Sequence, residues 1–256
     1  MTTLRNGRTT ELAGVDILIL AGGLGTRLRG VLPDSPKILA PVLGKPFLEY
    51  LLSGLSAQGC RRFVLSLGYR AEAVTAWLET NRFPSLEVQT VTEPEPLGTG
   101  GALALASTAL RSDPVLVING DTVADVDLNE FLRCHIAADT AATMLCARVD
   151  DARRYGIIEI DSSERIVKFA EKDERVIGPQ WINAGYYLFS QTLVGQIQRT
   201  LTTGSLERDV LERMPQGSVG AFRTEGRFLD IGTPETLREA ADLLTGGMRA
   251  RIEPGK

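Results

Sequence analysis

The first half of the chain alternates short apolar runs with segments of helical periodicity. The apolar runs have strand length and cover residues 16–21, 62–67, 87–92 and 114–119. Apolar side chains recur at helical spacing over residues 47–57, 71–79, 100–110 and 128–137. Strands separated by helices predict βαβ units, and hence an α/β fold whose mostly parallel sheet is covered on both faces.

The second half has more strand-like runs and fewer helices. Strands are expected at residues 143–149, 156–160, 166–169, 181–189 and 218–222, and a last helix at 234–244. No repeat or low-complexity linker separates the halves. We therefore expect one domain over residues 16–245, with halves at about 16–140 and 141–245 that enclose a cleft. Residues 1–15 are interpreted as an N-terminal extension and residues 246–256 as a C-terminal tail.

Composition excludes several classes of protein. The 256 residues carry a net charge of −4, which gives no basic surface for nucleic acid. No apolar run approaches the roughly 20 residues that span a bilayer, and the start lacks the apolar core of a secretory signal. These features favour a cytoplasmic protein that contacts neither nucleic acid nor membrane.

The few cysteines and the single histidine also limit the chemistry. Cys60, Cys134 and Cys146 are odd in number and widely spaced, so reduced, mostly buried thiols are expected. His135 is the only histidine, which excludes a His-based metal cluster and almost excludes Ser-His-Asp and Cys-His catalysis.

A glycine-rich loop follows the first predicted strand, at residues 22–27. Glycines let backbone N–H groups approach phosphates, and the loop also carries Arg27, with Lys37 further on. Leu28 occupies the place of the third glycine of a dinucleotide-binding fingerprint, and no Gly-Lys-Ser/Thr follows, so neither common phosphate loop is present. On its own, such a loop is equally compatible with a tight turn and two solvated cations.

Two further polar clusters follow predicted strands. Residues 93–101 come after one strand, and Gly120-Asp121 after the most apolar one. Chemistry in parallel sheets lies beyond the carboxyl ends of the strands, so these clusters and the glycine loop are expected to meet.

The string LAGGLGTRL at residues 20–28, followed by Pro36-Lys37 and Pro41, resembles the signature of the sugar-1-phosphate nucleotidylyltransferase family. The resemblance extends over residues 17–244. It implies a Rossmann-like three-layer nucleotidyltransferase fold, with a mixed, mostly parallel central sheet and a sugar-binding lobe. One departure is Ile38, where many relatives have a second proline.

The resemblance assigns roles on the nucleotide side. Asp121 and Asp230, the latter in the string DIGTP, would bind Mg²⁺. Arg27 would stabilise the leaving pyrophosphate, and Lys37 the α-phosphate. With Asp121 these two form the expected catalytic group. The residues implied for nucleotide binding are Leu20, Ala21, Gly22, Gly23, Gly25, Thr26, Glu95, Leu97, Gly98, Thr99 and Gly120.

The resemblance assigns a second set to the sugar phosphate. Glu171 would bind sugar hydroxyls and Lys172 the phosphate, although a Glu-Lys pair alone is usually a solvated surface feature. The other residues implied are Tyr155, Gly156, Asn183 and Gly185. In this reaction a sugar 1-phosphate oxygen attacks the α-phosphorus of a nucleoside triphosphate, and because that oxygen is already anionic no general base is needed.

Three longer strings resemble D-glycero-α-D-manno-heptose 1-phosphate guanylyltransferases, which make GDP-heptose for bacterial capsule, surface-layer or lipopolysaccharide synthesis. These are residues 32–52 (LPDSPKILAPVLGKPFLEYLL), 95–102 (EPLGTGGA) and 204–212 (GSLERDVLE). A mannose-1-phosphate guanylyltransferase and an amino-sugar-1-phosphate uridylyltransferase remain alternatives. The partners implied are GTP or another triphosphate and a sugar 1-phosphate, and a homodimer is compatible with the sequence.

Two hypotheses belong to other classes. A non-catalytic regulatory subunit that binds nucleotide sugars would be favoured by loss of Arg27, Lys37, Asp121 or Asp230, and all four are present. A dinucleotide-dependent oxidoreductase would need a third glycine and an acidic residue at the end of the second strand, where Leu67-Gly68-Tyr69 stands instead.

Overall fold

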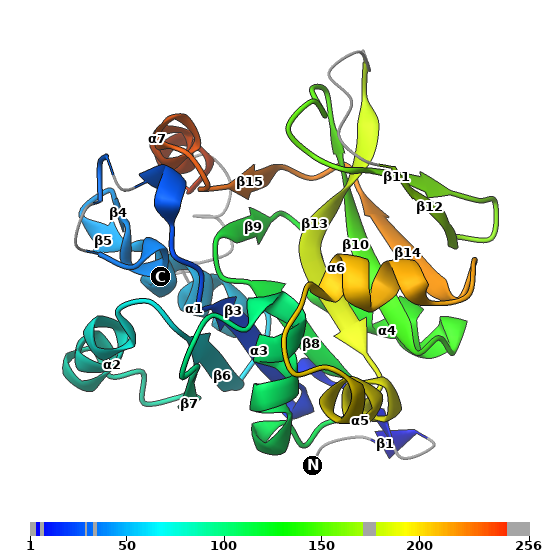
Figure 1. The fold of residues 1–256 in the computed structure, drawn as a ribbon, viewed down its shortest axis with the longest axis horizontal. Coiled ribbons are helices and arrows are strands. Elements are labelled where there is room, and N and C mark those ends of the chain that lie inside the picture. Colours follow the sequence, from blue (N-terminus) through cyan, green and yellow to red (C-terminus); the bar gives the residue numbers. More distant parts are fainter. Residues whose placement is uncertain (1–3, 6–7, 29, 33–34, 171–177, 245–256) are drawn as a thin grey trace.

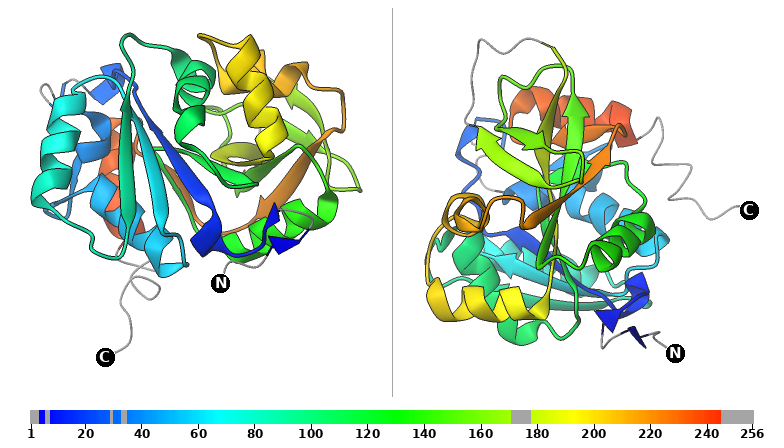
Figure 2. Two further views of the ribbon diagram at one scale, coloured as in Figure 1. Left: turned by 90° about the horizontal axis from the view of Figure 1, so that it is seen from below. Right: turned by 90° about the vertical axis from the view of Figure 1, so that its right-hand side faces the viewer.

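The computed structural model describes residues 4–5, 8–28, 30–32, 35–170 and 178–244. Over these residues a nine-stranded mixed sheet forms the centre of the molecule, and helices cover both of its faces (Figures 1 and 2). Three two-stranded pairs lie outside this sheet. The α/β fold class predicted from the alternation of strands and helices is confirmed.

The first half of the sheet is parallel and has the strand order β7-β6-β3-β8. These strands are β3 (Asp16–Ala21), β6 (Arg62–Leu67), β7 (Glu87–Thr92) and β8 (Val115–Asn119). The chain moves outward from β3 to β7 and then returns to place β8 on the other side of β3. This reversal is a topological switch point, where the loops after β3 and β8 diverge and leave a crevice at the carboxyl edge.

The second half of the sheet is built around the long strand β13 (Gln180–Phe189), which pairs antiparallel with β8. On β13 lie two further groups of strands, β10 (Ala142–Val149) with β14 (Val219–Thr224), and β11 (Ile157–Ile160) with β12 (Ile166–Ala170). The strand β13 therefore joins the two halves.

Helices pack on both faces because the strands alternate their apolar side chains. In β3, Ile17 and Ile19 join one buried cluster and Leu18 joins the other. The first cluster includes residues of α1 (Phe47–Ala57), α2 (Ala71–Thr80), α4 (Leu128–Ala138) and α7 (Pro234–Leu243). The second includes residues of α3 (Gly98–Ala106), α5 (Gln191–Thr200) and α6 (Leu206–Asp209).

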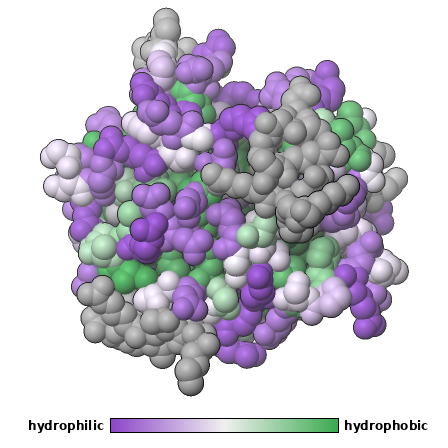
Figure 3. Space-filling model, turned by 180° about the vertical axis from the view of Figure 1, so that it is seen from behind, coloured by the Kyte–Doolittle hydropathy of each residue, from purple (hydrophilic) through white to green (hydrophobic). Residues whose placement is uncertain are grey.

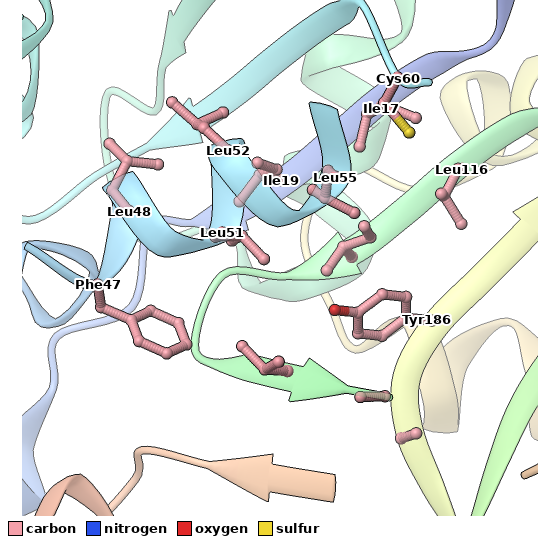
Figure 4. Packing of buried hydrophobic residues seen from close by; sticks show 14 of the residues in the cluster. Ile17, Ile19, Phe47, Leu48, Leu51, Leu52, Leu55, Cys60, Leu116 and Tyr186 are labelled. Carbon is pink, nitrogen blue, oxygen red and sulfur yellow. The ribbon is translucent and has the colours of Figure 1, made fainter. Parts of the chain in front are cut away.

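Helix α1 shows how apolar residues at helical spacing pack against the sheet. Its residues Leu48, Leu51, Leu52 and Leu55 form one helical stripe, and each is at most 4% exposed. They face Ile17 and Ile19 of β3 across the first cluster (Figure 4). Burial of each such side chain stabilises the fold by about 1.5–3 kcal/mol relative to exposure.

The predicted strands and helices of residues 16–244 are present, with ends that differ by at most a few residues. The helix expected at 100–110 starts earlier, at Gly98, and its end tightens into the 3₁₀ turn Ser107–Ala109. Helices α5 and α6 were not predicted, although each starts after a serine that caps it, Ser190 and Ser205 respectively. Serine is a favoured residue at this position.

Several short strands and 3₁₀ turns were not predicted either. They are β1 (Leu4–Arg5), β2 (Arg8–Thr9), β4 (Pro41–Val42), β5 (Lys45–Pro46), β9 (Thr122–Ala124) and β15 (Phe228–Asp230), and the 3₁₀ turns Leu12–Gly14, Thr26–Leu28, Lys37–Leu39 and Leu211–Arg213. In the segment expected to be an extension, β1 pairs with β2, while Leu12 and Val15 pack in the first cluster.

The three cysteines form no disulfide, and the single histidine is buried. Cys60, Cys134 and Cys146 are free thiols, and burial raises the pKa of Cys60 to about 12. His135 is buried on α4, with Nδ1 2.8 Å from Thr143 Oγ1.

The face of the molecule seen from behind is mixed in polarity: hydrophilic residues cover much of it, with smaller hydrophobic patches between them (Figure 3). Among the described residues, no helix is long and apolar enough to cross a membrane.

Candidate active site

A cavity of about 380 Å³ opens at the carboxyl ends of β3 and β8, at the switch point of the sheet. Its walls come from the glycine loop after β3, the segment after β7, the start of α3, and the turn after β8. The lining includes these predicted residues: Leu20, Ala21, Gly22, Gly23, Gly25, Thr26, Arg27, Lys37, Gly98, Thr99, Gly120 and Asp121. Three segments that were expected to meet therefore do so.

The glycine loop is held close to its neighbours. Gly25 has φ of 56°, which favours glycine, and the following turn at Thr26–Leu28 leaves Arg27 exposed at the cavity. Gly22 accepts a hydrogen bond on its carbonyl oxygen from the Tyr69 N–H, at 3.3 Å. Gly120 N–H donates to the Leu20 carbonyl at 2.9 Å, which ties the end of β8 to the start of the loop.

Lys37 lies between two carboxylates. Its Nζ is 2.5 Å from Asp121 Oδ2 and 3.6 Å from Asp230 Oδ1. Asp121 follows β8, and Asp230 ends β15, which pairs with β9 so that Asp230 stands opposite Thr122. Ile231 N–H donates to the Asp121 carbonyl at 2.9 Å. A short strand pair thus brings together two carboxylates from distant parts of the sequence.

This pair of carboxylates fits a small divalent cation. Asp230 Oδ1 is buried and accepts no hydrogen bond, and a Cβ on Gly232 would come within 2.6 Å of it. The described residues contain no group of three or more His, Cys, Asp or Glu that could hold a metal alone. Two carboxylates completed by phosphate oxygens and water are, however, the usual Mg²⁺ set in phosphate-binding sites.

Glu93 is a lining residue that the sequence analysis did not select. It directly follows β7 and is 8% exposed. Its Oε2 accepts a hydrogen bond from Leu97 N–H at 3.0 Å, and its Oε1 accepts one from Ser66 Oγ at 3.4 Å. Burial raises the pKa of this carboxyl, and the two hydrogen bonds oppose that effect. The available signal was its position, immediately after a predicted strand.

A hydrogen-bond chain links strand β13 to the start of helix α3. Asn183 Nδ2 donates to Tyr187 Oη at 2.7 Å, and that hydroxyl donates to Glu207 Oε1 at 2.7 Å. Glu207 Oε2 accepts from Ser205 Oγ at 2.8 Å and from Thr99 Oγ1 at 3.3 Å. Because Tyr187 is buried, the chain fixes Asn183 on β13 relative to Thr99 at the start of α3.

Tyr155, which was expected to bind the sugar phosphate, lies near the carboxylate pair. Tyr155 stacks edge-on against Phe228, with ring centroids 5.7 Å apart. Burial raises the pKa of Tyr155, and the negative charges of Asp230 and Asp121 raise it further. A Cβ on Gly156 would lie 3.2 Å from the Ala170 carbonyl oxygen.

Several predicted site residues do not line the cavity. Glu95 is exposed outside it, and Leu97 contributes its backbone N–H to Glu93. Asp230 pairs with the lining residue Lys37. Asn183 and Gly185 lie on β13, and Gly185 abuts the lining residue Asn119. Glu171 and Lys172 fall outside the described residues. Asn119, the last residue of β8, lines the cavity and was not among the predicted residues.

Comparison with known proteins identifies relatives of this chain. The chain is 34% identical over 227 residues to the D-glycero-α-D-manno-heptose 1-phosphate guanylyltransferase of Aneurinibacillus thermoaerophilus, covering 88% of this chain and 96% of that protein. It is 35% identical over 236 residues to the mannose-1-phosphate guanylyltransferase of Mycobacterium tuberculosis, covering 91% of this chain. Of that longer enzyme, the match spans only 65%.

The same relationship holds for solved structures. HddC from Yersinia pseudotuberculosis superposes with a TM-score of 0.80 at 36% identity, over 89% of this chain and 98% of that one. A second structure of HddC is complexed with GMP-PN. The family model of the nucleotidyl transferases matches residues 17–246. From the glycine loop through the DIGTP string, this chain therefore belongs to the nucleotidyl transferase family.

Proposed function

We propose that this protein transfers GMP from GTP to a sugar 1-phosphate, with D-glycero-α-D-manno-heptose 1-phosphate as its substrate, and so makes GDP-heptose for bacterial surface polysaccharide. The observation that carries the proposal is the cavity at the switch point, where the glycine loop and Arg27 face Lys37 between two carboxylates.

The reaction needs charge neutralisation more than acid–base catalysis. A phosphate oxygen of the sugar 1-phosphate forms a bond to the α-phosphorus of GTP, and the bond from that phosphorus to the bridging oxygen breaks to release pyrophosphate. The nucleophile is anionic at neutral pH, so no side chain has to remove a proton. Arg27 offers donors to the departing pyrophosphate, and Lys37 offers its ammonium to the α-phosphate. Lys172 is assigned to the sugar phosphate and Glu171 to sugar hydroxyls.

Asp121 and Asp230 are the residues that would hold Mg²⁺. When bound there, the cation supplies charge neutralisation and alignment for the phosphate oxygens of the two substrates. The ammonium of Lys37 would move from the carboxylates toward the phosphates as the cation takes its place.

Guanine is favoured by the chemistry of Glu93. An ionised carboxylate accepts hydrogen bonds and donates none. Guanine presents two adjacent donors, the N1–H and the 2-amino group. Uracil and thymine instead present one N–H between two carbonyl acceptors. The buried carboxyl of Glu93, which lines the cavity, would in its ionised form therefore complement guanine and oppose uracil and thymine.

The resemblance of residues 32–52, 95–102 and 204–212 to the heptose enzymes favours heptose over mannose. Mannose 1-phosphate remains the second candidate, because identity to the two relatives is nearly equal, at 34% and 35%.

Substrate profiling tests the proposal. The purified chain would be incubated with Mg²⁺ and each of GTP, ATP, UTP and CTP against the 1-phosphates of heptose, mannose and glucose, with pyrophosphate release as the readout. We expect the fastest release with GTP and heptose 1-phosphate. Faster release with UTP would overturn the base assignment, and no release with any pair would overturn the proposed activity.

A further inference from the structure

Asn119 ends β8 with a polar group that has no partner. Its Oδ1 is buried and accepts no hydrogen bond, and the residue lines the cavity. A buried acceptor without a donor costs about 1–3 kcal/mol, so such atoms are rare in folded proteins. Because the residue lines an open cavity, this acceptor is a candidate partner for a donor that arrives with a ligand.

The amide of Asn119 is held in position by the neighbouring strand. A Cβ on Gly185 of β13 would come within 2.7 Å of Asn119 Nδ2 and within 3.1 Å of its Cγ. Gly185 also has φ of 74°, and its N–H donates to Asn183 Oδ1 at 2.8 Å. The absence of a side chain at Gly185 therefore makes room for the amide of Asn119, and the sugar-side strand fixes it.

The location of Asn119 joins the two halves of the site. Its backbone pairs with Leu20 of β3, where the glycine loop starts, and its side chain abuts β13. It also precedes Asp121 by two residues, so it lies beside the carboxylates assigned to the phosphate-bound cation. A group that reaches Asn119 must therefore be near a phosphate and on the sugar-binding side.

The chemistry of the acceptor restricts that group. Phosphate oxygens and the sugar ring oxygen are themselves acceptors and cannot satisfy Oδ1. A sugar hydroxyl can, because it both donates and accepts. In a sugar 1-phosphate, the hydroxyl nearest the phosphate is that on C2, one carbon away from the phosphorylated C1.

We propose that Asn119 is a specificity-determining residue that binds the C2 hydroxyl of the sugar 1-phosphate. This inference rests on the proposed function. Gly185 is the positioning residue that leaves space for the amide. The hydrogen bond forms only when the sugar is bound, which explains why the acceptor has no partner within the described protein.

A residue-by-substrate cycle tests this assignment. Wild type and Asn119→Leu would be assayed with the sugar 1-phosphate that the wild type uses fastest and with its 2-deoxy derivative. We expect Asn119→Leu to lower kcat/KM about 10- to 100-fold with the parent sugar and less than about 3-fold with the 2-deoxy sugar. Asn119→Ala should repeat this pattern if the larger leucine disturbs packing.

Stability separates a binding role from a structural one. Since Oδ1 makes no bond in the protein, its loss should leave the Tm of Asn119→Leu unchanged or raised. Asn129→Leu, on the exposed start of α4, is the matched control and should leave both kcat/KM and its ratio between the two sugars unchanged.

Three outcomes would overturn the inference. Equal losses with both sugars would show that Asn119 does not contact the C2 hydroxyl. A loss that disappears with 2′-deoxy-GTP or 3′-deoxy-GTP would assign the amide to the ribose. A rise in the Mg²⁺ concentration needed for half-maximal rate would make Asn119 a metal ligand. In each of these cases the chain still uses a sugar 1-phosphate, whereas absence of any turnover would remove the proposed function itself.

Discussion

Gly22 lies directly against the carboxylate of Glu93: a Cβ on Gly22 would come within 1.9 Å of Glu93 Oε1. This contact joins the glycine loop after β3 to the segment after β7. The backbone φ of Gly22 is not in the left-handed region, so the requirement for glycine comes from space and not from conformation. The lack of a Cβ at Gly22 thus leaves the space that the Glu93 carboxylate occupies beside the cavity.

Gly22→Ala should therefore destabilise the protein. Overpacking of this kind costs about 1–3 kcal/mol, which lowers the Tm of a chain of this size by roughly 2–12 °C. Gly23→Ala is the matched control for stability, because a Cβ on Gly23 meets nothing within 4 Å. Differential scanning calorimetry of both variants checks this, and equal Tm values would contradict the contact.

Glu93→Gln should change how stability depends on pH. Burial raises the pKa of Glu93 above its ordinary value of 4.5, so the folded protein binds the proton more tightly than the unfolded chain does. This group's contribution to stability is fully present below pH 4.5 and is lost as pH rises through the raised pKa. The Tm of the glutamine variant minus that of wild type should grow over this range and then stay constant. A difference that does not depend on pH would mean that burial does not shift this carboxyl.

Loss of a charged side chain beside the reacting phosphates should strongly lower turnover without unfolding the protein. Arg27→Ala and Asp121→Ala should each lower kcat by about three orders of magnitude, because each removes electrostatic stabilisation of transferred phosphoryl groups. Circular dichroism spectra should match the wild type. Arg82→Ala, at an exposed position away from the cavity, should release pyrophosphate at the wild-type rate. Near-normal release by either site variant would refute its assigned role.

Lys37 should act as a counter-charge for Asp121 and Asp230 when Mg²⁺ is removed. EDTA is expected to abolish wild-type activity while changing the Tm little, because the ammonium already balances the carboxylates. In Lys37→Met the two carboxylates lose this cation, and the Tm in EDTA should fall by about 2–8 °C. Mg²⁺ should then raise the Tm of the variant more than that of wild type.

Lys45→Met provides the control for Lys37→Met. Lys45 pairs with Glu49 at 2.6 Å, but its side chain is 58% exposed, so its loss should cost less than about 1 kcal/mol. If both lysine variants had the same Tm in EDTA, Lys37 would have no special role as a counter-charge.

Tyr187→Phe should weaken the connection between β13 and α3. The variant leaves Asn183 Nδ2 and Glu207 Oε1 without the hydroxyl that joins them, at a cost of about 1–3 kcal/mol. Because we propose that Asn183 binds the sugar, KM for the sugar 1-phosphate should rise more than KM for GTP. Glu207→Gln retains an oxygen that can accept from Tyr187, so it should have the smaller effect. An unchanged Tm and equal KM shifts in Tyr187→Phe would argue against this connection.

The glycine loop and its strand could be predicted from the sequence because the signal is local. A run of five apolar residues after Asp16, and the glycines that follow it, determine β3 and the turn without help from distant parts. The pairing of Asp121 with Asp230 could not be worked out in that way, since it depends on β9 and β15, which have three residues each. Strands that short carry no measurable periodicity, so only the family resemblance indicated the pair.

Glu93 and Asn119 were missed for a different reason. Each stands at the end of a correctly predicted strand, but a polar residue there can face the cavity or the solvent. That choice depends on register between strands and on the space left by Gly22 and Gly185. The spacing of residues in the sequence predicts where each residue lies along its strand. It does not predict how much space the neighbouring residues leave for the side chain.

The β9–β15 pair also has a consequence for the order in which the protein is made. The central sheet is complete once β14 ends at Thr224, whereas Asp230 lies beyond it. A nascent chain can therefore assemble most of its core on the ribosome while Asp121 still lacks its partner. The capacity to hold a divalent ion would thus be acquired only after the strands of the central sheet have been synthesised.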